Sequence, residues 1–198
     1  MKRIGSGLKF FTSELVLGSL VAILSVLAAV SGYQSSMADS DQTKNNVLGQ
    51  QMLTDANAEY LTANQMIVYD YTMYDGWYMT DDADKEEYYQ LSFSPELQAS
   101  IAANESDPFS DAYYEAMHAA PQAMFDEADR FYEVAEQWNE RGDALQLVLL
   151  VSALALAFAA WASLLGAESR VRLFFALFSI VGLVYSLMLY VAVPVVVG

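Results

Sequence analysis

The sequence contains no cysteine and a single histidine, His118, which limits the chemistry that the chain can perform. Without cysteine it forms no disulfide, no thiolate nucleophile and no cysteine-based metal site. Glu115 precedes His118 by three residues, but a di-metal carboxylate site in a helical bundle needs two such Glu-x-x-His pairs. The sequence offers no Ser-His-Asp set, phosphate-binding loop or pair of catalytic acids. We therefore predict a protein that is not an enzyme and needs no cofactor.

Basic residues are also few. The chain has 9 Lys and Arg against 25 Asp and Glu, a formal net charge of −16. Residues 34–143 alone hold four basic and 23 acidic residues, a net charge of −19. Nucleic acid is excluded as a partner, because contacts to phosphate need Lys and Arg. An anionic membrane surface would likewise repel this region.

Charge is absent altogether from three apolar runs, residues 15–32, 144–165 and 173–197. A helix needs about 20 apolar residues to cross a bilayer. No alternating strand pattern is evident, so we predict an all-α membrane protein with three transmembrane helices. Its extracytoplasmic helical domain is formed by extensions of the first and second spans. The predicted segments are an N-terminus (1–11), a first span (12–33), the acidic domain (34–143), a second span (144–165), a loop (166–172) and a third span (173–197).

The basic residues indicate the orientation of these spans. Lys2, Arg3 and Lys9 precede the first span, and Arg170 and Arg172 lie between the second and third. The positive-inside rule places both groups in the cytoplasm. We therefore predict a multi-pass protein of the cell (inner) membrane, with a cytoplasmic N-terminus and with the acidic domain and the C-terminus outside.

Small residues recur on one stripe of each of the first two spans. Such stripes let helix backbones approach closely in lipid. We predict that the two stripes pack against each other, the alternative being that one faces another subunit, and that Leu20 faces lipid. The stripe residues are Gly18, Ala22, Ser25 and Ala29 in the first span, continuing to Gly32, and Ser152, Ala155 and Ala159 in the second, continuing to Ala162 and Gly166.

The first span is predicted to continue as a helix to about residue 75, because no proline interrupts it. The final long helix is predicted to begin at Pro121 and to run into the second span. Between them, Thr80 caps a helix over 81–90, and Ser94 with Pro95 begins another. The inward-facing residues of the two long helices recur at intervals of three, four or seven. They are Leu53, Ala56, Tyr60, Ala63, Ile67 and Tyr74 in the first and Met124, Ala128, Phe131, Ala135, Trp138, Gly142 and Leu145 in the second.

Two groups in the acidic domain are candidate sites. Asp81, Asp82 and Asp84 are oxygen ligands of the kind that Ca²⁺ prefers, although they lack EF-hand spacing, and a solvated helix start explains them more simply. Aromatic residues crowd positions 69–114, either as the core of a small domain or as a contact surface. Trp77 and Tyr78, together with Tyr88, are the leading candidates for a partner interface.

The layout resembles an uncharacterised bacterial family of small membrane proteins with one N-terminal span, a helical extramembrane segment and a C-terminal hairpin of two spans. Gly32-Tyr33-Gln34 matches the start of that segment, and residues 144–165 and 173–189 match the hairpin. The long tyrosine-rich insert departs from the family. The resemblance implies no activity and assigns no functional residues.

These observations favour a non-enzymatic accessory or scaffold subunit, in contact with membrane lipids and assembled as a homo-oligomer or in a larger membrane complex. The alternative is a pore-forming homo-oligomer whose acidic outer vestibule concentrates cations. A third reading is an extracytoplasmic sensor, which would need a separate signalling partner.

Overall fold

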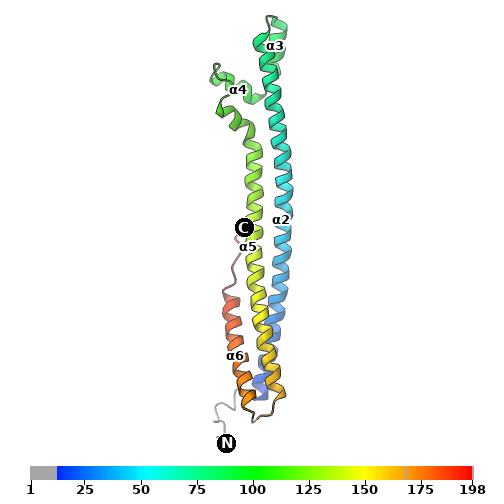
Figure 1. The fold of residues 1–198 in the computed structure, drawn as a ribbon, viewed down its shortest axis with the longest axis vertical. Helices are drawn as coiled ribbons and strands as arrows, with labels where there is room; N and C mark the ends of the chain where they lie inside the picture. Colours follow the sequence, from blue (N-terminus) through cyan, green and yellow to red (C-terminus); the bar gives the residue numbers. More distant parts are fainter. Residues whose placement is uncertain (1–12, 168, 198) are drawn as a thin grey trace. The chain divides into compact units, whose positions relative to one another are not determined.

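The computed structural model describes residues 13–167 and 169–197, and all of its regular structure is helical. Lys2, Arg3 and Lys9 and the terminal Gly198, used above to predict the orientation, lie outside these ranges. The described helices are α2 (Glu14–Met79), α3 (Ala83–Leu91), α4 (Pro95–Ala103), α5 (Asp111–Leu164) and α6 (Arg170–Val191) (Figure 1). Among them, α2, α5 and α6 are each long and apolar enough to cross a membrane. The predicted all-α class with three candidate spans is confirmed.

The chain divides into two compact units. One consists of Met1–Asn45 with Glu133–Gly198 and contains the three apolar segments, and we call it the membrane unit. The other, Asn46–Tyr132, is the distal unit. The helices α2 and α5 contribute to both units, whereas α6 belongs to the membrane unit and α3 and α4 to the distal unit.

In the membrane unit, the small-residue stripe of α5 faces inward. Ser152, Ala155 and Ala159 are 0–2% exposed. The α6 helix approaches this stripe so closely that a Cβ on Gly182 would lie 2.6 Å from the Cβ of Ala155. Without side chains between them the two backbones gain dispersion contacts along the helices, which is the main source of helix association in lipid.

The corresponding stripe of the first span faces the other way. Gly18, Ala22, Ser25 and Ala29 are exposed, and Leu17, Leu20 and Leu24 are buried instead. The expectations that the two stripes meet within the chain and that Leu20 faces lipid are therefore wrong. The leucines of α2 fill the space left by small residues on α5 and α6, in a cluster of Leu17, Leu20, Ala159, Ala162 and Ala176. Contact between the first-span stripe and another subunit stays a prediction.

The third apolar helix is shorter than predicted, and it begins earlier. Arg170 and Arg172 lie in its first turn, and the Arg172 Nη1 donates a hydrogen bond of 2.9 Å to the carbonyl oxygen of Leu165, the residue after α5. The helix ends at Val191 rather than at 197, because Pro194 cannot donate to a helix and disfavours helical backbone just before it.

The segment after α6 is fastened to α5 by polar contacts. The Arg141 Nη1 donates to the Pro194 carbonyl oxygen at 2.7 Å, and the Val197 backbone N–H donates to Oε1 of Gln137 at 2.9 Å. Both contacts satisfy backbone groups that no helix satisfies here.

In the distal unit, α2 and α5 pack through small side chains. Ala56, Ala63 and Ala128 are at most 7% exposed. A Cβ on Gly49 would lie 3.0 Å from the ring of Tyr132, so the glycine makes room for that ring. The predicted stripe of α5 is buried or half-buried throughout, but Leu53 and Tyr60 on α2 are exposed, at 37% and 44%.

Pro121 lies inside α5 rather than at its start, so the predicted helix boundary is wrong. A proline inside a helix removes one backbone hydrogen bond and crowds the preceding turn, at a cost of about 3 kcal/mol. The segment before Pro121 nevertheless stays helical because Tyr113 and Met117 are buried in the core of the distal unit.

Burial of Ala128 gives a direct test of this packing. We expect Ala128→Asp to lower the free energy of unfolding by roughly 3–5 kcal/mol, because it buries a carboxylate without a partner. Ala123→Asp, an exposed position on the same helix, is the matched control and should change it little. Thermal unfolding of the detergent-solubilised protein, followed by circular dichroism, measures both. Equal unfolding temperatures for the two variants would contradict the packing.

Candidate functional site

A buried carboxylate organises the distal unit. Asp70 on α2 is 0% exposed. It accepts three hydrogen bonds, from the Ser94 backbone N–H at 2.9 Å, from the Ser94 Oγ at 2.5 Å and from the Tyr113 hydroxyl at 2.7 Å. Ser94 is the N-cap of α4 and also accepts from the Leu97 N–H at 3.1 Å. One side chain therefore joins α2, the start of α4 and α5.

The surroundings of Asp70 affect the tyrosine next to it. Burial, and then the hydrogen bond and negative charge of Asp70, raise the pKa of the Tyr113 hydroxyl above its ordinary value. Tyr113 therefore stays protonated and donates its hydrogen bond over the whole physiological range. A carboxylate satisfied by three fixed donors serves structure, since all its partners belong to the fold itself.

Aromatic side chains pack around this network. The buried residues of the cluster are Ile67, Phe93, Leu97, Tyr113 and Met117. Further rings surround it, with Tyr71 stacked on Phe109 at 4.1 Å between ring centroids and Tyr74 packed edge-to-face on Phe109 at 5.3 Å. Much of the aromatic crowding seen in the sequence is thus the core of a small domain, which was the competing interpretation.

The three predicted interface residues do not share one environment. Trp77 packs inside the aromatic cluster, 5.3 Å from Tyr74 and 6.2 Å from Phe93 between ring centroids. Tyr78 and Tyr88 are 76% and 60% exposed. Trp77 therefore packs in the cluster, whereas Tyr78 and Tyr88 lie largely in solvent, and contact of the three with a partner stays a prediction.

A groove lies beside these residues, between α2, α3 and α4. It encloses about 520 Å³, and we call it the distal groove. The α3 helix is held against α2 by Tyr89, whose ring lies where a Cβ on Gly76 would come within 2.6 Å. Leu91, which lines the groove, is 76% exposed, and Met79 at the end of α2 is 80% exposed. The groove is lined by Trp77, Glu87, Gln90, Leu91, Phe93, Gln98, Ile101 and Ala102.

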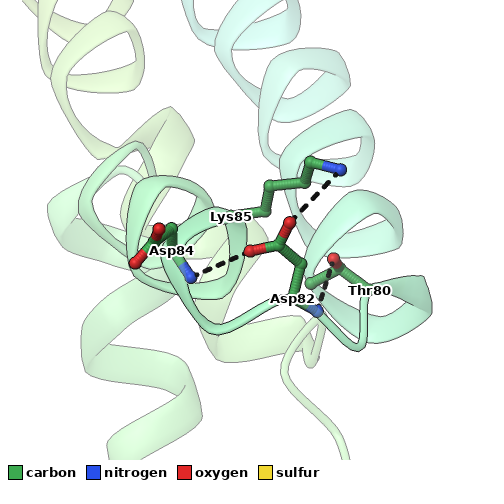
Figure 2. A network of polar contacts seen from close by, with 4 residues as sticks. All are labelled: Thr80, Asp82, Asp84 and Lys85. Carbon is green, nitrogen blue, oxygen red and sulfur yellow. Dashed lines mark hydrogen bonds and ion pairs between the residues drawn. The ribbon is translucent and has the colours of Figure 1, made fainter.

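The acidic turn before α3 is a helix cap. The Oδ1 of Asp82 accepts from the Asp84 backbone N–H at 3.1 Å, and Lys85 lies 3.6 Å from its Oδ2 (Figure 2). Asp82, not Thr80, is the N-cap, and Thr80 accepts from the Asp82 N–H at 3.3 Å. Among the described residues no group of three His, Cys, Asp or Glu side chains is placed to hold a metal ion, and this includes Asp81, Asp82 and Asp84.

The single histidine takes part in packing. His118 stacks on Tyr60 at 5.0 Å between ring centroids. Its Nδ1 lies 2.9 Å from the Tyr114 carbonyl oxygen and its Nε2 lies 3.2 Å from Oδ1 of Asn64. Both ring nitrogens are thus occupied within the distal unit.

A second groove, of about 450 Å³, lies in the membrane unit between α2 and α6. Its lining is almost wholly apolar, as expected for a surface against lipid tails. The Tyr190 hydroxyl donates to Oε1 of Gln34 at 3.2 Å, which holds α6 to α2 there. The groove is lined by Ala22, Ile23, Val26, Leu27, Val30, Leu187 and Tyr190.

The sequence interpretation missed Asp70 as the organising residue. A signal was present, because Asp70 lies three residues after Ile67 and four before Tyr74 on the inward stripe of α2. A carboxylate on an apolar stripe needs a buried partner. Its partner, the Ser94 cap, had been identified separately, but only the tertiary structure joins the two.

Comparison of the chain with protein-family models, with curated proteins and with solved structures finds no match. The bacterial family resemblance therefore stays a prediction, and the functional argument rests on the structure.

Removing one donor from the Asp70 network should destabilise the distal unit. We expect Tyr113→Phe to lower the free energy of unfolding by about 1–3 kcal/mol, because Asp70 then loses one of its hydrogen bonds while remaining buried. Tyr69→Phe, an exposed tyrosine of the same unit, is the control. Urea unfolding followed by circular dichroism compares the two. Identical midpoints would show that the network contributes nothing.

The Tyr71–Tyr114 hydroxyl pair gives a prediction for alkaline pH. The hydrogen bond to Tyr71, together with partial burial, raises the pKa of Tyr114 from 10.0 to about 12. The pKa of Tyr114 is higher in the folded state than in the unfolded chain, so its protonated hydroxyl stabilises the fold. This contribution to the free energy of unfolding is complete below pH 10.0 and is lost as the pH rises through about 12. Ultraviolet titration of Tyr71→Phe should show one tyrosine ionising at lower pH than in the parent. The amplitude of the titration falls in any case, because the substitution removes one phenol. A tyrosine that still ionises at the same high pH as in the parent would contradict the pairing.

Proposed function

We propose that the protein is a non-enzymatic accessory or scaffold subunit of a membrane complex, and that its distal unit lies outside the cytoplasm and binds a partner protein through the distal groove. The observation that carries this proposal is the nearly uncharged lining of that groove within a strongly acidic region, on helices α2 and α3 that also carry large exposed apolar and aromatic side chains. Tyr78, Met79, Tyr88 and Leu91 are each at least 60% exposed.

The composition of the groove fits protein recognition. Interface cores are depleted in charge and enriched in aromatic residues and methionine. Of the residues that line the groove, Glu87 alone is charged, although the surrounding region 34–143 has a net charge of −19. Leaving large apolar side chains in water costs free energy, and a partner that covers them recovers it.

The supports of the groove favour a fixed docking surface. Asp70 ties α2 to the start of α4, and Tyr89 packs α3 onto α2 at Gly76. Side chains that are already ordered lose little entropy on binding. This arrangement suits a scaffold, whose role is to present a surface in one geometry.

The orientation is supported by Arg170 and Arg172 in the first turn of α6, which the positive-inside rule places in the cytoplasm. The chain has no native cysteine, so a single introduced cysteine is the only thiol that a maleimide can label on this protein. We expect Ser40→Cys to react with an impermeant maleimide added to intact cells, and Ala167→Cys, in the turn between α5 and α6, to react only after permeabilisation. Both positions are exposed. The reverse pattern would overturn the orientation.

The scaffold role is tested by the mass of the complex. The protein purified from its own membrane in mild detergent should have a native mass that is not a whole multiple of 21.9 kDa, because the complex also contains foreign subunits. Tyr88→Ala with Leu91→Ala should lose those subunits while helicity is preserved, since both side chains are exposed. Met66→Ala, exposed but away from the groove, should keep them. A ring made of this chain alone would overturn the proposal and favour a pore.

A further inference from the structure

The distal part of α2 has two opposite faces. Its inner face is buried and includes Ala56, Ala63, Ile67 and Asp70. On the other side, eight residues recur at alternating intervals of four and three, all of them exposed, and we call them the outer face. Leu61 and Val68 are 61% and 65% exposed there. The outer face consists of Val47, Gln51, Thr54, Ala58, Leu61, Gln65, Val68 and Thr72.

The outer face is uncharged, and so are nearly all of its flanks. The residues on either side of it are Leu48, Asp55, Thr62 and Tyr69, and Gln50, Asn57, Asn64 and Tyr71, of which Asp55 alone carries a charge. Residues 34–143 as a whole have a net charge of −19. An exposed helix face in such a region gains solubility from charge, so its absence over this length indicates a surface that is covered.

The spacing of the outer face is that of a helix pair. Intervals of four and three place residues on the seam between two helices that wind around each other. Three of the four residues in one series of the seam are apolar, and the other series holds two glutamines, an alanine and a threonine. The first series is Val47, Thr54, Leu61 and Val68, and the second is Gln51, Ala58, Gln65 and Thr72. A groove of about 570 Å³ lies at the start of this face, lined by Val47, Gln50, Gln51, Thr54 and Asp55.

A second copy of the chain fits this seam better than an unrelated helix does. Two copies inserted in the same membrane share one orientation, so their α2 helices run parallel. In a parallel two-fold pair each position meets itself, Leu61 against Leu61 and Gln65 against Gln65. Glutamine carries both a donor and an acceptor, so two opposed amides satisfy each other, and a polar residue on such a seam also fixes register.

The acidic charge of the region also favours a second copy of the chain as the partner of the outer face. Two copies of so acidic a region repel each other wherever carboxylates meet, and like charges brought together across an interface cost several kcal/mol. Contact between residues 47 and 72 brings only Asp55 near its counterpart, and the face ends before Asp75, the next position in the same spacing. The apolar content of the seam is modest, but copies confined to one membrane meet at a high effective concentration, so a weak contact suffices.

We infer that the outer face of α2 pairs in parallel with the same face of a second copy of this chain, so that the scaffold subunit is a dimer. The inference deepens the proposed function and rests on it. The pairing uses residues 47–72, separate from those that line the distal groove, so both surfaces can be occupied at once.

Cysteine cross-linking in native membranes tests the pairing, again without background from native cysteine. Under copper phenanthroline oxidation the full-length Leu61→Cys and Val68→Cys variants should form disulfide dimers. Glu59→Cys and Met66→Cys, exposed positions off the outer face, are matched controls and should stay monomeric. Cross-linking at all four positions alike, or at none, overturns the inference.

A second measurement separates this inference from the proposed function. Leu61→Asp with Val68→Asp should remove one copy of the chain from the native mass of the complex and abolish cross-linking at Thr54→Cys, with helicity intact because both positions are exposed. Met66→Asp should do neither. A complex with a single copy and foreign subunits would overturn the pairing and leave the scaffold proposal standing. If the foreign subunits are lost from Tyr88→Ala with Leu91→Ala but are kept by Leu61→Asp with Val68→Asp, which loses one copy of the chain, the result supports both the scaffold proposal and the pairing.

Discussion

The carboxylate of Asp70 is the constraint on which the distal unit depends. A buried charge is tolerated only where donors replace the water that it lost. Here the donors come from the N-cap of α4 and from a tyrosine of α5, so satisfying one charge fixes where two other helices lie. The distal groove is built on these same elements, with Trp77 from α2 and Phe93 just before Ser94. Its shape therefore follows from the network beneath it.

Close approach of helices is the second constraint, and small residues decide where it occurs. Gly182 meets Ala155 in the membrane unit, whereas Gly49 accepts Tyr132 and Gly76 accepts Tyr89 in the distal unit. In each case the glycine has no side chain, so a neighbouring backbone or ring can approach it closely. Because α5 provides the small stripe of the membrane unit, α2 turns Leu17, Leu20 and Leu24 inward, and Gly18, Ala22, Ser25 and Ala29 are left exposed.

The distribution of charge connects these packing choices to function. Between residues 126 and 143, α5 carries a dense series of acids, and the turn before α3 carries another. Two surfaces of the distal unit have almost none of this charge, the distal groove and the outer face of α2. Exposed surfaces that lack charge in an acidic region are where other proteins can approach without repulsion. The first is the surface that we propose as the docking site, and the second is the surface that we propose for pairing of two copies.

The sequence by itself determined the class of the protein and several local features. Uncharged apolar runs of about 20 residues favour helices there, because a helix satisfies its backbone hydrogen bonds within one segment. The Ser94-Pro95 helix start was predicted from local hydrogen bonding alone and is present in the structure. Such features depend on neighbours in sequence, so a single chain read from end to end reveals them.

Tertiary packing decided the rest, since it depends on which distant residues meet. The stripe of small residues in the first span could equally face a neighbouring helix or the outside, and only the fit of Leu17 and Leu20 against α5 and α6 chose between them. Pro121 is a strong local signal for a helix start, but burial of Tyr113 and Met117 outweighs it and keeps α5 continuous. Asp70 and Ser94 are 24 residues apart, and no local rule pairs a lone carboxylate with a helix cap at that distance. Periodicity states that a residue lies on a face, but only the folded structure says what that face meets.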